Sequence, residues 1–120
     1  MTAQPLSLGF IGLGIMGAPM AVHLANAGHR LFVHTRSAVR DEVAATAAVV
    51  CATAREVAER ADIVFLMLPD TPDVAQVLFG AAGVSEGLSS GKAVVDMSSI
   101  SPIETKAFAA RINGLGCDYL

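Results

Sequence analysis

The stretch Leu8-Gly9-Phe10-Ile11-Gly12-Leu13-Gly14-Ile15-Met16-Gly17 decides the fold of this chain. It has the pattern of an apolar strand, a glycine-rich turn and the start of a helix, and its last three glycines have G-x-G-x-x-G spacing. Gly12 permits a tight turn, Gly14 lets a pyrophosphate approach the main chain, and Gly17 lets the helix pack closely on the strand. The motif predicts a dinucleotide-binding site, with a structural turn in another α/β domain as the alternative.

The residues that follow this turn complete a βαβ unit. Met16, Met20 and Leu24 recur at helical spacing, and Gly28 is placed to end that helix as its C′ residue. A second apolar run at 31–33 comes directly afterwards. Further along, we expect helices at 39–45, 53–60, 71–79 and 101–113, a loop at 80–87, and strands at 47–50, 63–68, 93–97 and from 117. This alternation predicts an α/β fold with a Rossmann-type, doubly wound, mainly parallel sheet in a three-layer αβα arrangement.

Three helix starts and one strand are marked by specific residues. Thr53 and Ser101 are each followed by Glu three residues later, which is the capping-box spacing. Thr71 before Pro72 indicates an N-cap followed by proline in the first turn. The run at 63–68 is apolar without alternation, as expected of a central strand that is buried on both faces.

The composition fits a single domain of 120 residues, which we expect to be a dinucleotide-binding domain over 1–120. Only 16% of the residues are charged, and the mean hydropathy is +0.57. We therefore expect apolar surface that faces another domain or subunit, and a homo-oligomer in the full-length form. A net charge of −3 without a basic cluster argues against nucleic-acid and anionic-membrane partners.

The cysteines and the N-terminus indicate a cytoplasmic protein. Cys51 and Cys117 are far apart in the sequence and form no C-x-x-C motif, which favours reduced, partly buried thiols over a disulfide or a metal site. The first five residues lack a positive n-region, and glycines interrupt the apolar stretch behind them. We expect neither a signal peptide nor a membrane-spanning helix.

The end of the second strand bears on which nucleotide binds. NAD-selective folds place an acidic residue there, whereas this chain has Thr35 and Arg36 and no acid before Asp41. A guanidinium can hold a phosphate through two hydrogen bonds, so Arg36 favours NADP(H). Two alternatives stay open: Arg36 is a solvated surface residue, or the domain accepts NAD(H) as well.

Three blocks of the chain resemble the β-hydroxyacid dehydrogenase family in order and spacing: 9–21 (GFIGLGIMGAPMA), 67–70 (MLPD) and 96–102 (DMSSISP). The resemblance covers essentially the whole chain and implies an NAD(P)-dependent oxidoreductase of short hydroxy or oxo acids. It also implies that 67–69 form a loop under the cofactor and that Ser99 contacts its nicotinamide side. Thr35 departs from the family, where many members have Asn.

Together, the motif and the resemblance give the predicted cofactor-binding residues, which are Gly12, Leu13, Gly14, Ile15, Met16, Gly17, Thr35, Arg36, Leu68, Pro69 and Ser99. For Met16, Met20, Met67 and Met97 we expect core packing. For Ser98 and Ser99 the alternative role is local backbone bonding or capping.

We predict no catalytic residue and no metal site within the chain. The resemblance implies that a substrate-positioning Ser-Gly-Gly segment and a helical domain with the catalytic lysine follow residue 120. Other candidate acids are better explained as surface or packing residues; they are Lys92, Lys106, His23, His29 and His34. We therefore expect the cofactor-binding part of a reductase, truncated before its catalytic domain. A stand-alone nucleotide-binding module without activity is the alternative.

Overall fold

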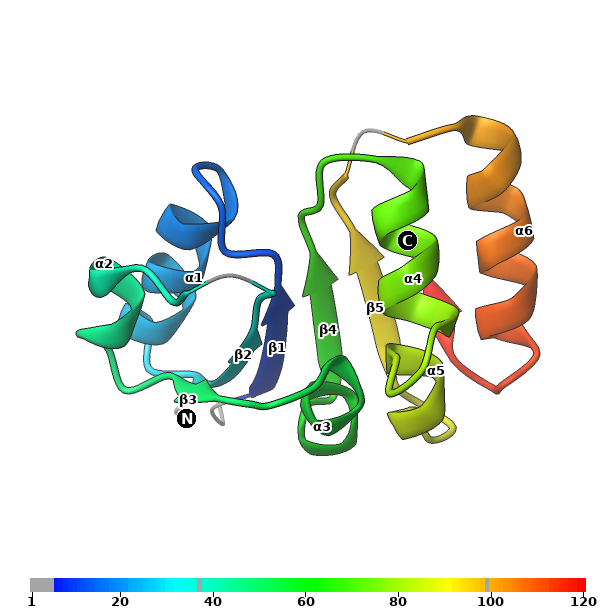
Figure 1. Ribbon diagram of the computed structural model, residues 1–120. Helices are drawn as coiled ribbons and strands as arrows, with labels where there is room; N and C mark the ends of the chain where they lie inside the picture. Colours follow the sequence, from blue (N-terminus) through cyan, green and yellow to red (C-terminus); the bar gives the residue numbers. More distant parts are fainter. Residues whose placement is uncertain (1–5, 37, 99) are drawn as a thin grey trace.

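The computed structural model describes residues 6–36, 38–98 and 100–120. Its six strands form one parallel sheet in the order β3-β2-β1-β4-β5-β6, and helices cover both faces (Figure 1). The strands are β1 (Ser7–Ile11), β2 (Arg30–His34), β3 (Val49–Val50), β4 (Ile63–Leu66), β5 (Ala93–Asp96) and β6 (Asp118–Tyr119). The helices are α1 (Gly17–Asn26), α2 (Asp41–Ala44), α3 (Ala54–Arg60), α4 (Thr71–Phe79), α5 (Val84–Gly87) and α6 (Pro102–Asn113). The Rossmann-type fold is confirmed.

The centre of the sheet positions the candidate site. β1 pairs with β2 on one side and with β4 on the other, and Gly9 lies opposite both Phe32 and Val64. The chain builds the sheet outward from β1 in one direction, and then returns to β4 and builds in the other. In open α/β sheets, ligands bind outside the carboxyl ends of the strands at this reversal.

Two apolar cores lie on the two faces of the sheet. α1 and α2 pack on one face, where Phe10 and Val43 are buried, and α3, α4, α5 and α6 pack on the other. β4 contributes to both cores, because Val64 and Leu66 face one while Phe65 packs against the other. This explains the unbroken apolar run, and the predicted central position of this strand is confirmed.

The predicted capping residues occupy the expected places at two helix starts. The Thr53 hydroxyl accepts a hydrogen bond from the Glu56 N–H at 3.1 Å, and the Ser101 hydroxyl accepts one from the Glu104 N–H at 3.4 Å. At the end of α1, Gly28 has a φ of +91°, which is the left-handed conformation expected of a C′ glycine.

The start of α4 differs from the prediction. Asp70, not Thr71, is the N-cap, and its carboxylate accepts from the Thr71 N–H at 2.7 Å. The Thr71 hydroxyl instead accepts from the Ser101 N–H at 3.1 Å, so it ties the start of α4 to the start of α6. Capping by Thr71 was therefore wrong by one residue, because an acidic side chain immediately before it takes the role.

Several boundaries also differ. The helix expected at 39–45 is limited to α2, the strand expected at 63–68 ends at Leu66, and the loop expected at 80–87 contains α5. The short α5 packs beside α3, where Gly87 lies so close to the Arg55 carbonyl that a Cβ would collide with it.

In the part of the chain that the structure describes, no helix is long and apolar enough to cross a membrane.

Candidate dinucleotide-binding site

A cleft of about 530 Å³ opens at the carboxyl ends of the central strands. Its walls come from the glycine-rich turn after β1, the end of β2, the loop after β4 and one residue of α4. Of the predicted site residues, those that line this cleft are Gly12, Leu13, Gly14, Ile15, Met16, Gly17, Thr35, Arg36, Leu68 and Pro69. Ser99 lies outside the described residues. The fold therefore brings segments from three places in the sequence to one cleft.

Two glycines of the turn are required by the fold itself. Gly12 has a φ of +100°, and a Cβ there would collide with the carbonyl oxygen of Met67 in the neighbouring loop. A Cβ on Gly17 would collide with the Gly12 carbonyl oxygen and would lie 3.1 Å from the Phe10 ring. Both positions therefore exclude any larger residue for reasons of packing.

Gly14 differs because it faces open space. A Cβ built there meets nothing within 4 Å, so this residue, which lines the cleft, has room for a side chain without a collision with the fold. The neighbouring N-cap residue of α1 is Met16, which has no oxygen to cap the N–H groups, and the first turn contains no acidic residue. An uncapped helix N-terminus beside a bare stretch of main chain fits the pyrophosphate of a dinucleotide.

The three apolar side chains of the turn have different positions. Leu13 is 3% exposed and packs in the core, although it also lines the cleft. Ile15 and Met16 are 79% and 68% exposed and form the rim of the cleft. The expected core packing of Met16 was therefore wrong, because the turn carries its side chain away from the sheet before α1 begins.

The loop after β4 is held by a chain of hydrogen bonds. The Leu68 N–H donates to the Ser98 hydroxyl at 2.8 Å, and the Ser98 N–H donates to one oxygen of Asp96 at 2.9 Å. The other Asp96 oxygen accepts from the Tyr119 hydroxyl. Burial, and then the Asp96 carboxylate, raise the pKa of the Tyr119 phenol above its usual range. The position of this cleft-lining loop thus depends on residues of β5 and β6.

This role of Ser98 was missed from the sequence. Local backbone bonding or capping was the alternative role given for Ser98, whereas its hydroxyl accepts from the N–H of Leu68, 30 positions earlier. Leu68 follows β4 and Ser98 follows β5, and these two strands are neighbours in the sheet. The sequence contained a signal for this contact, because both residues lie at the carboxyl ends of predicted strands, and the carboxyl ends of adjacent parallel strands lie side by side.

The far end of the cleft carries an ion pair. The Arg36 guanidinium donates to the Asp73 carboxylate at 2.9 Å, and the two side chains are 67% and 24% exposed. Asp73 lies in the first turn of α4, and it was not among the site residues predicted from the sequence. Arg36 is thus exposed, as the surface alternative expects, and it also lines the cleft.

His34 lies between this cleft and a smaller one of about 180 Å³, and it lines both. Its Nδ1 is 3.1 Å from the Cys51 carbonyl oxygen. Because a carbonyl only accepts, Nδ1 carries the proton in this bond. Burial and then Glu56 raise the pKa of the Cys51 thiol to about 11, so this thiol is protonated at neutral pH.

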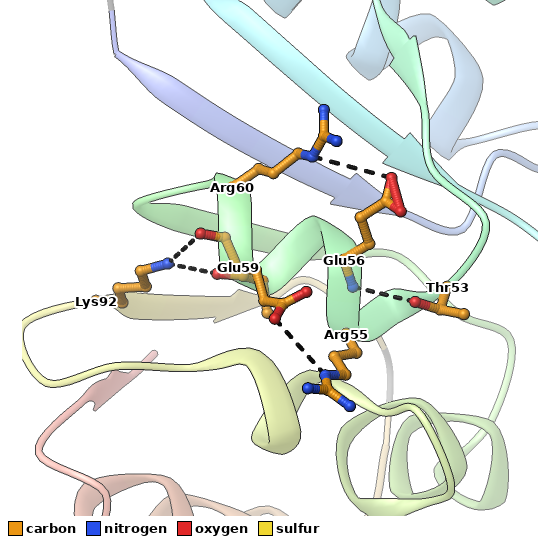
Figure 2. Close-up of polar contacts among 7 residues, drawn as sticks. Thr53, Arg55, Glu56, Glu59, Arg60 and Lys92 are labelled. Atoms are coloured by element: carbon orange, nitrogen blue, oxygen red, sulfur yellow. Dashed lines mark hydrogen bonds and ion pairs between the residues drawn. The ribbon is translucent and has the colours of Figure 1, made fainter.

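The other candidate acids lie in other parts of the structure. The Lys92 ammonium donates to the carbonyl oxygens of Ala58 and Glu59 at 2.6 and 2.9 Å, at the end of α3 (Figure 2). His29 accepts from the Leu6 N–H at 3.2 Å, and both His23 on α1 and Lys106 on α6 are exposed. Among the described residues, no group of three or more His, Cys, Asp or Glu could hold a metal ion.

Comparison with solved structures supports the fold. Mycobacterium tuberculosis 3-hydroxyisobutyrate dehydrogenase with L-serine superposes with a TM-score of 0.85 at 27% identity, over 97% of this chain and 39% of that one. An imine reductase from Myxococcus stipitatus in complex with NADP⁺ gives a TM-score of 0.84 at 27% identity, over 94% and 39%. The V8 variant of that imine reductase, in complex with NAD⁺, gives 0.84 at 26% identity, over 97% and 40%.

Comparison with known sequences gives the family. Escherichia coli 2-hydroxy-3-oxopropionate reductase is 58% identical over 115 residues, which are 96% of this chain and 39% of that protein. The chain thus spans about two fifths of the length of this relative. A family model described as the NAD binding domain of 6-phosphogluconate dehydrogenase matches residues 7–120. The chain therefore belongs to the family of the NAD-binding domain of 6-phosphogluconate dehydrogenase, and its resemblance to β-hydroxyacid dehydrogenases is confirmed.

Proposed function

We propose that residues 1–120 are the cofactor-binding part of a reductase that prefers NADP(H) and acts on 2-hydroxy-3-oxopropionate (tartronate semialdehyde) or a related short oxo acid. The observation that carries this proposal is the single cleft lined by the glycine-rich turn, the Arg36 region and the loop after β4. The 58% identity to the Escherichia coli reductase supports the substrate class.

In this proposal, each wall of the cleft has one task. The main chain at Gly14 and the start of α1 hold the pyrophosphate, while Thr35 and Arg36 face the adenosine ribose. Leu68 and Pro69 support the nicotinamide half from the loop fixed by Ser98. Ser99 is proposed to contact the same half. When bound, the reduced nicotinamide supplies a hydride.

The preference for NADP(H) rests on charge. Arg36 carries the only formal positive charge among the described residues that line the cleft, and no acidic residue lines it. A phosphate on the adenosine ribose would meet this guanidinium, whereas the two ribose hydroxyls of NAD(H) would not be bound by an acid. The imine reductase bound to NADP⁺ and its variant bound to NAD⁺ show that this fold accommodates both cofactors.

The chain by itself is proposed to bind the cofactor without catalysing turnover. Hydride addition to an aldehyde leaves an alkoxide, and the proton it needs typically comes from a positioned general acid that contributes about 10²–10⁴-fold. Among the described residues that line the cleft, His34 is the one candidate acid, and its Nδ1 proton is donated to the Cys51 carbonyl at the adenosine end. A proton donor is therefore expected outside this sequence.

The test compares two proteins in the presence of NADPH and 2-hydroxy-3-oxopropionate. One is the 120-residue chain, and the other is a chimera that joins it to the remainder of the Escherichia coli reductase. The loss of NADPH absorbance should be at the uncatalysed rate with the chain and rapid with the chimera. Equal turnover by the two proteins would contradict the proposal, as would a chimera that folds and binds substrate but does not oxidise NADPH.

A further inference from the structure

Asp73 contacts Arg36, the one cation among the described residues that line the cleft, without being one of those lining residues. Its carboxylate oxygen lies 2.9 Å from the terminal nitrogen of Arg36, across 37 residues of sequence. Arg36 follows β2 and Asp73 lies on α4, so the ion pair joins two separate elements at the adenosine end. The Arg36 guanidinium on this wall therefore already has a carboxylate partner before a ligand binds.

The acidic partner is the better fixed of the two. Asp73 is the third residue of α4, its N–H donates to the Asp70 carbonyl oxygen at 3.1 Å, and its side chain is 24% exposed. The positive end of the helix dipole stabilises its negative charge. Val77, one turn further along the same helix face, lines the cleft. Arg36 is 67% exposed and has a long, flexible side chain, so it is the partner that can turn to a ligand.

An incoming phosphate would share or take this guanidinium. If Arg36 left Asp73, the ion pair would be lost; if it kept both partners, two anions would face each other across one cation. Either arrangement opposes binding of a phosphorylated ribose. A cofactor without the phosphate leaves the pair intact and carries no such cost.

We infer that Asp73 is a specificity-determining residue whose carboxylate competes with the adenosine 2′-phosphate for Arg36 and so narrows the preference for NADPH over NADH. This inference rests on the proposed cofactor site. In this inference Asp73 changes the ratio of the affinities for NADPH and NADH, in addition to its role in the first turn of α4.

The test is a titration of the 120-residue chain with NADPH and NADH, by calorimetry, for the parent and for Asp73→Asn. Removing the charge should lower the dissociation constant for NADPH about two- to fivefold, the range typical of one exposed ion pair, and leave that for NADH unchanged. Glu104→Gln is the matched control, because Glu104 is the third residue of α6, at the opposite edge of the molecule from β2 (Figure 1). It should change neither value.

A double-mutant cycle separates competition for Arg36 from a structural effect. In the Arg36→Ala background, Asp73→Asn should have less effect on NADPH than in the parent, because the shared cation is gone. Weaker NADPH binding by Asp73→Asn, equal changes for both cofactors, or an equal effect in both backgrounds would overturn the inference. A folded parent that binds neither cofactor would overturn the proposed function together with it.

Discussion

The glycine-rich turn and the Arg36 end form two walls of one cleft, and they are built by different means. At the turn, the protein offers main chain: Gly14 faces open space, and the N-cap residue Met16 has no polar side chain. At the other wall, it offers a charged side chain that is already paired with Asp73. We propose that the turn provides affinity for any dinucleotide, whereas the Arg36 end discriminates between dinucleotides.

The largest expected effect comes from Gly14→Val. Its side chain should occupy the pyrophosphate's place and weaken both NADPH and NADH by more than about a hundredfold, since hydrogen bonds to charged groups contribute about 1.5–3 kcal/mol each. The free energy of unfolding should stay at the parent value, because a Cβ at this position meets nothing within 4 Å. Calorimetric titration and chemical denaturation measure the two quantities.

Gly17→Ala is the contrasting variant of the same turn. Its Cβ would collide with the Gly12 carbonyl oxygen, so the free energy of unfolding should fall as well as the affinity. Parent-like cofactor binding by Gly14→Val would show that the pyrophosphate does not lie on this turn.

A smaller and selective effect is expected from Arg36→Ala. NADPH should bind about tenfold more weakly, near the lower limit for a charged hydrogen bond, because the side chain is 67% exposed. NADH should change little, and the selective loss should shrink at high ionic strength. Arg30→Ala, at the opposite end of β2, removes the same charge and is the control. Equal losses for both cofactors would remove the distinction between the two walls.

The smallest effect is expected from Ser98→Ala, which acts on the loop between these regions. The Leu68 N–H would lose its acceptor, at a cost of about 1 kcal/mol in the free energy of unfolding. Because both cofactors share the nicotinamide half, their affinities should fall together, by about two- to fivefold. Denaturation and titration of the same preparation measure both effects. A loss of affinity for NADPH alone would show that Ser98 acts on the Arg36 end of the cleft instead.

The sequence predicted the part of the site that depends on local backbone chemistry. The spacing of Gly12, Gly14 and Gly17 defines a turn whose shape is set within a few residues, and the capping patterns at Thr53 and Ser101 are equally local. The doubly wound parallel sheet followed from the alternation of strands and helices, because parallel strands need crossover connections.

Contacts between distant segments were not predicted. The Arg36–Asp73 pair and the Ser98–Leu68 hydrogen bond join residues 37 and 30 positions apart, and no spacing rule connects them. The N-cap of α4 was misassigned because Asp70 and Thr71 are both good capping residues. In the structure the Asp70 carboxylate caps α4, and the Thr71 hydroxyl bonds Ser101 instead. Side-chain partners of this kind depend on how neighbouring strand ends and helix starts are arranged in space.

Titration of the purified 120-residue chain with NADPH and then with NADH tests the central claim most directly, namely that this cleft binds a dinucleotide and prefers the phosphorylated one. Binding at a single site, with a lower dissociation constant for NADPH, is the predicted result. A folded chain that binds neither cofactor, or that binds NADH more tightly than NADPH, would contradict it.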